Sequence, residues 1–122
     1  MAPHDELTAL LTNADLFLCP SIYEPLGIVN LEAMGCETAV LASRVGGIPE
    51  VVADNETGRL VNYNAYNAAK FESDFTNQIE ELMANPSLLT QMGKAGRIRA
   101  EKHFGWDAVA KQTIELYKSL LK

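Results

Sequence analysis

Residues 15–42 read DLFLCPSIYEPLGIVNLEAMGCETAVLA, and this stretch decides the fold. It contains two short apolar runs, at 15–19 and 39–42, on either side of a longer apolar segment at 27–36. The two runs have the length of strands, whereas the segment between them has the length of a helix. Continuously apolar strands joined through a helix are typical of a parallel sheet that is covered on both faces.

The same alternation continues on both sides of this stretch. Leucines at helical spacing predict a helix over 5–13, and a further short helix is expected over 48–53. The turn residues of 54–58 precede a third apolar run at 59–61, which predicts a third strand. Residues 1–63 are therefore predicted to form an α/β portion with about three parallel strands and flanking helices.

Residues 64–122 are predicted to form a helical tail. One helix is expected over 67–84, a second from Pro86 to about His103, and a third over 106–121. Proline is well tolerated in the first turn of a helix but not in its interior, so Pro86 separates the first two. The apolar positions of the first helix recur every three or four residues and predict one buried stripe, formed by Ala68, Phe71, Phe75, Ile79 and Leu82.

Composition and charge narrow the class of protein. Apolar residues make up 48% and charged residues 21%, as in globular proteins. The net charge is −6, so nucleic acid is not an expected partner. No apolar run reaches the roughly 18 residues that a membrane span needs. The N-terminus also lacks the basic and apolar regions of a secretory signal, so a cytoplasmic protein is expected.

The two cysteines, Cys19 and Cys36, lie inside apolar stretches. Two thiols in a chain of 122 residues do not make a disulfide framework, and the sequence has no Cys-x-x-Cys motif. We therefore expect buried free thiols, and neither a metal nor another cofactor.

The loop between the first strand and its helix is the strongest candidate for chemistry. Glu24 precedes a proline, which disfavours helical backbone at Glu24 and keeps the chain extended. Ligands of open α/β sheets bind beyond the carboxyl ends of the strands, where this loop is expected. The free amides of Leu26, Gly27 and Ile28, together with the helix dipole, would form an anion site there. Such a site suits a diphosphate without a metal.

Only two polar side chains, Asn30 and Glu32, interrupt the apolar helix that follows. An unpaired carboxylate on a buried helix is costly, so Glu32 is expected to emerge into a cleft or to meet a partner. A carboxylate can accept hydrogen bonds from both hydroxyls of a ribose. A glutamate that simply reaches water is equally compatible with the spacing.

Glu24-Pro-Leu-Gly followed by Glu32-Ala-Met resembles the E-x7-E pattern of retaining GT-B glycosyltransferases, especially those of family 4. The resemblance covers residues 14–62 almost continuously. It also includes Met-Gly-x-x-Gly-Arg at 92–97 and Phe-Gly-Trp at 104–106. Within this family the phrase around Glu24 is most similar to that of bacterial ADP-glucose-dependent glycogen synthases.

The resemblance implies a fold and a set of roles. The chain would be a partial C-terminal nucleotide-sugar-binding domain, the last part of a Rossmann-like GT-B domain. Glu24 would be catalytic and contact hexose hydroxyls near the reacting carbon, and Glu32 would bind the ribose. The amides of Leu26, Gly27 and Ile28 would hold the distal phosphate and the sugar. Tyr23 would lie near the base, although a loop aromatic that covers the core is the alternative.

The implied activity is transfer of a hexose from a nucleotide-diphosphate sugar, ADP-glucose, to glycogen or a related α-glucan. In this family an Arg–Lys pair from earlier strands and an N-terminal domain complete the site. We therefore expect the chain alone to be inactive, with that domain as its missing partner. Because the truncated sheet has an open edge, self-association is also expected. The final helix adds to this expectation, since Trp106, Val109, Tyr117 and Leu120 would lack their natural cover.

Other classes of protein fit less well. A sugar epimerase of the GT-B fold is disfavoured by the Glu24-Pro-Leu-Gly string. A non-catalytic nucleotide-binding or interaction module stays open, and it predicts a natural gene product that starts near Met1. A response-regulator domain would need paired acidic residues near a lysine, and a metal-dependent transferase would show Asp-x-Asp; the sequence has neither. Gly93–Arg97 lacks the Gly-Lys-Ser/Thr order of a phosphate-binding loop.

The sequence departs from the family pattern at two positions. Glu37 stands where relatives usually have glycine, just past a helix end where a left-handed backbone is common. A glutamate in that conformation costs about 1 kcal/mol, so a different local turn is expected. Arg44 replaces a residue that is often acidic, which we interpret as a surface change.

Overall fold

The computed structural model describes residues 4–22, 28–105, 114–115 and 118–120. The helix expected over 106–121 falls largely outside these residues. The elements in chain order are α1 (His4–Asn13), β1 (Phe17–Cys19), α2 (Ile28–Gly35), β2 (Val40–Ser43), α3 (Ile48–Val51), β3 (Gly58–Val61), α4 (Ala68–Met83) and α5 (Pro86–Phe104).

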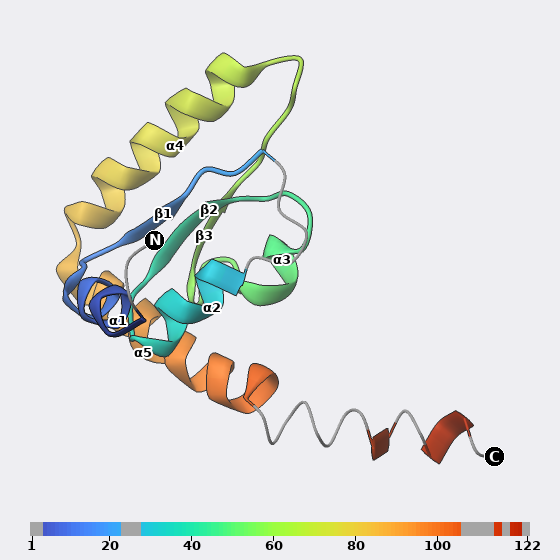
Figure 1. The fold of residues 1–122 in the computed structure, drawn as a ribbon. Coiled ribbons are helices and arrows are strands. Elements are labelled where there is room, and N and C mark those ends of the chain that lie inside the picture. The colour runs from blue at the N-terminus through green and yellow to red at the C-terminus, as the bar shows by residue number, and fades with distance from the viewer. Residues whose placement is uncertain (1–3, 23–27, 106–113, 116–117, 121–122) are drawn as a thin grey trace.

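The described strands form one parallel sheet in the order β1-β2-β3 (Figure 1). Phe17 pairs with Val40, and Val40 also pairs with Gly58, so the three strands start level with one another. The predicted α/β architecture, with about three parallel strands and flanking helices, is confirmed. β1 starts at Phe17, two residues later than expected, because Phe17 is the first residue that pairs with β2.

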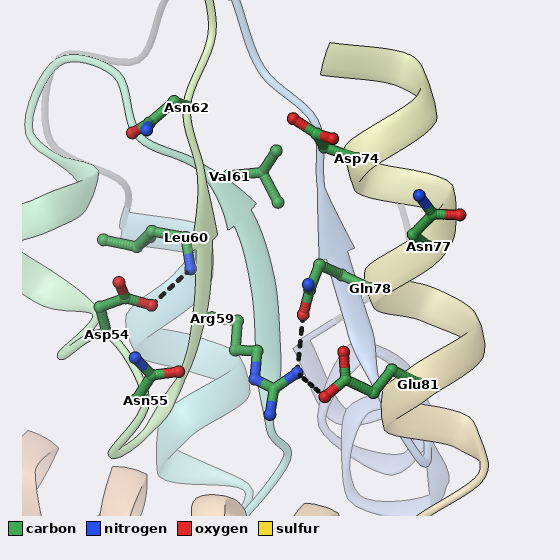
Figure 2. Close-up of a pocket in the computed structure, with 10 residues that line it drawn as sticks. All are labelled: Asp54, Asn55, Arg59, Leu60, Val61, Asn62, Asp74, Asn77, Gln78 and Glu81. Carbon is green, nitrogen blue, oxygen red and sulfur yellow. Dashed lines mark hydrogen bonds and ion pairs between the residues drawn. The ribbon is translucent and has the colours of Figure 1, made fainter. Parts of the chain in front are cut away.

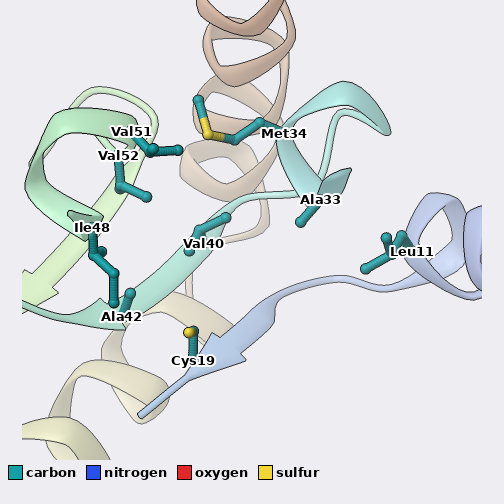
Figure 3. Packing of buried hydrophobic residues seen from close by; sticks show 9 residues of the cluster. All are labelled: Leu11, Cys19, Ala33, Met34, Val40, Ala42, Ile48, Val51 and Val52. Atoms are coloured by element: carbon teal, nitrogen blue, oxygen red, sulfur yellow. The ribbon is translucent and has the colours of Figure 1, made fainter. Parts of the chain in front are cut away.

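Both faces of the sheet are buried, as continuously apolar strands predict. Val40 and Ala42 face α2 and α3 and belong to one core cluster (Figure 3). Ala39 and Leu41 face the opposite way and belong to a second cluster under α4 and the start of α5. Figure 1 shows the same division, with α4 on one side of the sheet and α2 and α3 on the other.

The stripe predicted on α4 is mostly confirmed. Phe71, Phe75 and Leu82 are buried, and Ile79 packs beside them. Ala68 is exposed, so its place in the stripe was wrong. Phe71 lies at the end of this stripe. Its ring packs edge-on against the ring of Tyr63, at a centroid distance of 5.3 Å. Asn67 and Asn85 cap α4 and α5 by accepting hydrogen bonds from the amides of Lys70 and Leu88.

The turn after α2 keeps the left-handed backbone that a glycine would favour. Glu37 has a φ of 60°. Its N–H donates to the carbonyl of Met34 at 3.1 Å, and the N–H of Thr38 donates to the carbonyl of Ala33 at 3.0 Å. This pair of hydrogen bonds defines a Schellman motif. The expectation of a different turn was therefore wrong. The turn keeps the left-handed backbone at position 37, although a glutamate is strained in that conformation.

Cys19 and Cys36 are not joined in a disulfide. Cys19 is buried within the first core cluster, whereas Cys36 is only partly buried, at the end of α2. Arg44 is exposed and forms an ion pair with Asp54 at 2.7 Å, which agrees with its interpretation as a surface residue.

Candidate functional site

The first turn of α2 lies beyond the carboxyl end of β1. Because β1 and β2 are parallel, the helix that joins them starts near the end of β1 and returns to the start of β2. The first amides of a helix have no acceptor within the helix, so they are available to a ligand. Ile28 is the first residue of α2 and contributes one of these amides.

The structure describes only part of the predicted site. Tyr23, Glu24, Leu26 and Gly27 lie outside the described residues. Glu32 is exposed on α2. Within the described part of the chain, no hydrogen bond or ion pair engages its carboxylate. This exposure fits both a ribose-binding role and a glutamate that simply reaches water.

A serine at the end of β2 ties the two strand ends together. The hydroxyl of Ser43 is buried and lies 3.2 Å from the carbonyl oxygen of Cys19. The same hydroxyl donates to the carbonyl of Ser21, two residues further along. The path of the chain where it leaves β1 is therefore fixed by a side chain from β2, a contact that no sequence pattern indicated.

The loop after β2 closes the site on the side of α3. Gly46 has a φ of 52°, in the region that glycine favours. Pro49 and Glu50 lie in the first turn of α3, where a proline is tolerated and an acidic side chain favours the helix dipole. From α5, the guanidinium of Arg99 donates to the carbonyls of Val51 at 2.9 Å and Glu50 at 3.0 Å. The short helix α3 thus has a cationic cap at its carboxyl end.

A second arginine of α5 fixes α2 in the same way. The guanidinium of Arg97 donates to the carbonyl of Gly35, the last residue of α2, at 2.7 Å. Gly93 lets α5 approach the end of α2 closely, because a Cβ there would lie 2.1 Å from the carbonyl oxygen of Glu37. A Cβ at Gly96 would lie 3.4 Å from Cγ of Met34, which is ordinary van der Waals contact. Gly93 is therefore a packing residue, a role that no periodicity in the sequence indicates.

Asn30 is the second polar residue of α2. It is fully buried, and within the described residues both its amide nitrogen and its amide oxygen lack hydrogen-bond partners. The free-energy cost of an unpaired polar group on this helix therefore concerns Asn30, which is buried, and not Glu32, which is exposed.

A polar cavity of about 450 Å³ lies elsewhere, between β3 and α4 (Figure 2). Arg59 reaches across it from β3, and its guanidinium donates to Gln78 at 2.7 Å and pairs with Glu81 at 2.9 Å. Asp54 accepts from the amide of Leu60 at 3.0 Å while it pairs with Arg44. Arg59 therefore pairs across the groove with α4, although its Nε has no partner among the described residues, whereas Asp54 is held on the side of β3.

Among the described residues, no three His, Cys, Asp or Glu side chains are grouped so that they could hold a metal ion. In the part of the chain that the structure describes, every helix is too short or too polar to span a bilayer.

Comparisons with known proteins agree with this architecture. Residues 2–99 match the family model described as glycosyl transferases group 1. The chain is 48% identical over 120 residues to the α-maltose-1-phosphate synthase of Mycolicibacterium smegmatis, covering 98% of this chain and 31% of that protein. The chain thus spans about a third of the length of this relative.

Two solved structures share the fold. Sucrose-phosphate synthase from Thermosynechococcus elongatus superposes with a TM-score of 0.81 at 38% identity, over 99% of this chain and 29% of that one. Anabaena HepE, solved in complex with UDP and glucose, gives a TM-score of 0.75 at 23% identity, over 93% of this chain and 30% of that one. Together with the family match, these similarities show that the chain belongs to the group 1 glycosyltransferases, as part of a GT-B enzyme.

Proposed function

We propose that this chain is the donor-binding part of an enzyme that transfers glucose from ADP-glucose to a glucose-containing acceptor, such as glycogen or another α-glucan. The observation that carries the proposal is the 48% identity to an α-maltose-1-phosphate synthase along almost the whole chain. Maltose is built from glucose, so that relative's name supports glucose as the sugar that is moved.

The start of α2 supports a role in donor binding. The amide of Ile28 lies beyond the end of β1, where the helix dipole favours a diphosphate. We assign the neighbouring amides of Leu26 and Gly27 to the same diphosphate. HepE, which shares the fold, was solved with UDP and glucose bound. No metal is needed in this scheme, because helix amides take the place of a cation.

Two carboxylates complete the proposed donor site. Glu24 would contact the hexose hydroxyls near the reacting carbon, and Tyr23 would lie near the base. Glu32 would accept hydrogen bonds from the ribose, since its exposed carboxylate is accessible to both hydroxyls of a diol.

The rest of the enzyme is proposed to supply the acceptor site and the charges that stabilise the leaving diphosphate. The relatives are about three times as long as this chain. Charge that develops on the leaving group would otherwise meet only helix amides, and removing one such stabilising group typically costs about 100-fold or more in kcat. The chain alone is therefore expected to transfer no sugar.

The test is donor binding by the full natural polypeptide that contains residues 1–122. Calorimetry with ADP-glucose, UDP-glucose and GDP-glucose should show tightest binding of ADP-glucose. Equal or tighter binding of another nucleotide would refute the choice of ADP. Absence of binding to all three would refute the donor-binding role itself.

A further inference from the structure

The stability of the fold does not explain why an asparagine is buried at position 30 of α2. Its side-chain amide is fully enclosed, and neither the nitrogen nor the oxygen has a hydrogen-bond partner in the part of the chain that the structure describes. Thr38 and Ser43, buried polar residues nearby in the sequence, each donate a hydrogen bond to a backbone carbonyl. An apolar side chain at position 30 would avoid the loss of both hydrogen bonds, so stability does not favour asparagine there.

The position of Asn30 relates it to the proposed donor site. It lies on the same face of α2 as Ala33 and Met34, which are fully buried. The Cα–Cβ bonds of a helix tilt toward its N-terminus. The amide of Asn30 is therefore directed toward the first turn of α2, near the carboxyl ends of the strands.

The loop between β2 and α3 offers matching partners. α2 packs against α3, the helix into which this loop leads. Within the described residues, Arg44 and Ile48 donate backbone hydrogen bonds, to Val61 and Val45, but Gly46 and Gly47 donate none. Gly47 is buried as well. The unpaired acceptor of Asn30 thus lies on α2. The unpaired donors lie in the loop that leads into α3, a helix that α2 contacts.

We propose that Asn30 is a positioning residue of the donor site, whose side-chain oxygen accepts a hydrogen bond from the Gly46–Gly47 backbone when a nucleotide sugar is bound. The inference rests on the proposed function, because it assigns the ligand to the first turn of α2. In the ligand-free protein the amide is unpaired and lowers stability. In the complex the hydrogen bond holds the loop of α3 against α2.

The experiment compares thermal unfolding of the full natural polypeptide with and without ADP-glucose and UDP-glucose. Asn30→Leu should unfold at the same or a higher temperature than the wild type when no nucleotide is present. Its affinity for the nucleotide sugar should fall by about tenfold, which is the effect of losing one buried hydrogen bond on binding. Asn30→Ala provides a second variant in case leucine is too large for the site.

Thr38→Val is the matched control. Thr38 is also buried, but its hydroxyl already donates to the carbonyl of Leu11. This variant should unfold at a lower temperature and bind the nucleotide sugar as the wild type does. If both Asn30 variants lower the unfolding temperature and keep wild-type affinity, the residue is merely structural and the inference is wrong. If the wild type binds no nucleotide sugar, the proposed function fails first and the inference fails with it.

Discussion

Gly93 of α5 lies directly against the carbonyl oxygen of Glu37, in the turn between α2 and β2. A Cβ added to Gly93 would lie 2.1 Å from that oxygen, well inside van der Waals contact. The neighbour is backbone and cannot rotate away. This close approach fixes α5 against the end of α2, and through α2 it fixes the distance between α5 and the candidate site.

Gly93→Ala is therefore expected to destabilise the protein by about 1–3 kcal/mol, in spite of the better helix propensity of alanine. Chemical denaturation would measure the change. Gly35→Ala is the matched control, because a Cβ at Gly35 has no atom within 4 Å. The control should leave stability unchanged or raise it by about 0.5–1 kcal/mol. Equal effects of the two substitutions would contradict the packing argument.

Glu37→Gly is expected to stabilise the protein by about 1 kcal/mol, because Glu37 has a φ of 60° and glycine adopts that backbone without strain. The free energy of unfolding from urea titration is the appropriate measurement. Glu56→Gly serves as the comparison, since Glu56 is exposed and is not among the described residues with positive φ. A loss of stability in Glu37→Gly as large as in Glu56→Gly would show that the left-handed turn carries no strain.

Arg99→Met is expected to lower stability by about 1 kcal/mol, because the substitution removes the hydrogen bonds from the guanidinium to the carbonyls of Val51 and Glu50. Methionine keeps much of the aliphatic packing of the arginine stem. Lys94→Met, at an exposed position of the same helix, should change stability little. Matching losses in the two variants would mean that Arg99 acts through net charge and not through its cap on α3.

The strands and the break between α4 and α5 were predictable because their signals are local. The continuous apolar run at 39–42 identifies a buried parallel strand, and Asn85-Pro86 identifies the break between the two helices. The contacts that fix the site are not local. The contact between Gly93 and Glu37 joins residues 56 positions apart in the sequence, and no periodicity encodes it.

Burial on α2, next to the candidate site, could not be predicted from the sequence. The polar interruptions of α2 were visible in the sequence, but a helix pattern does not say which of Asn30 and Glu32 is buried when most neighbours are apolar. Burial depends on where the sheet and α5 lie, so the pattern alone does not show that Asn30 is buried. Glu32 is exposed, which agrees with both interpretations of it.

The isolated 122-residue chain is expected to self-associate through the open side of β1. Leu18 and Met83 are exposed large apolar side chains that line the same groove beside β1, and β1 pairs only with β2 among the described strands. Leu18→Lys should lower the average mass in light scattering toward that of a monomer. Ile98→Lys, at an exposed apolar position on α5, should not. A wild-type chain that stays monomeric at high concentration would contradict the expectation.

Glu32→Gln is expected to weaken binding of the nucleotide sugar by about 10- to 100-fold in the full natural polypeptide, because a neutral amide forms weaker hydrogen bonds to the ribose hydroxyls than a carboxylate does. The loss should appear mainly in KM and not in kcat, since the ribose lies away from the reacting carbon and its contacts stay the same in the transition state.

Glu72→Gln is the matched control for this change. Glu72 is an exposed glutamate on α4, a helix on the opposite face of the sheet from α2, and the substitution removes the same charge. If only Glu32→Gln weakens binding, long-range electrostatics is excluded and a local contact to the ribose is supported. If the affinity of Glu32→Gln equals that of Glu72→Gln, Glu32 simply reaches water, and the ribose must be held by another group.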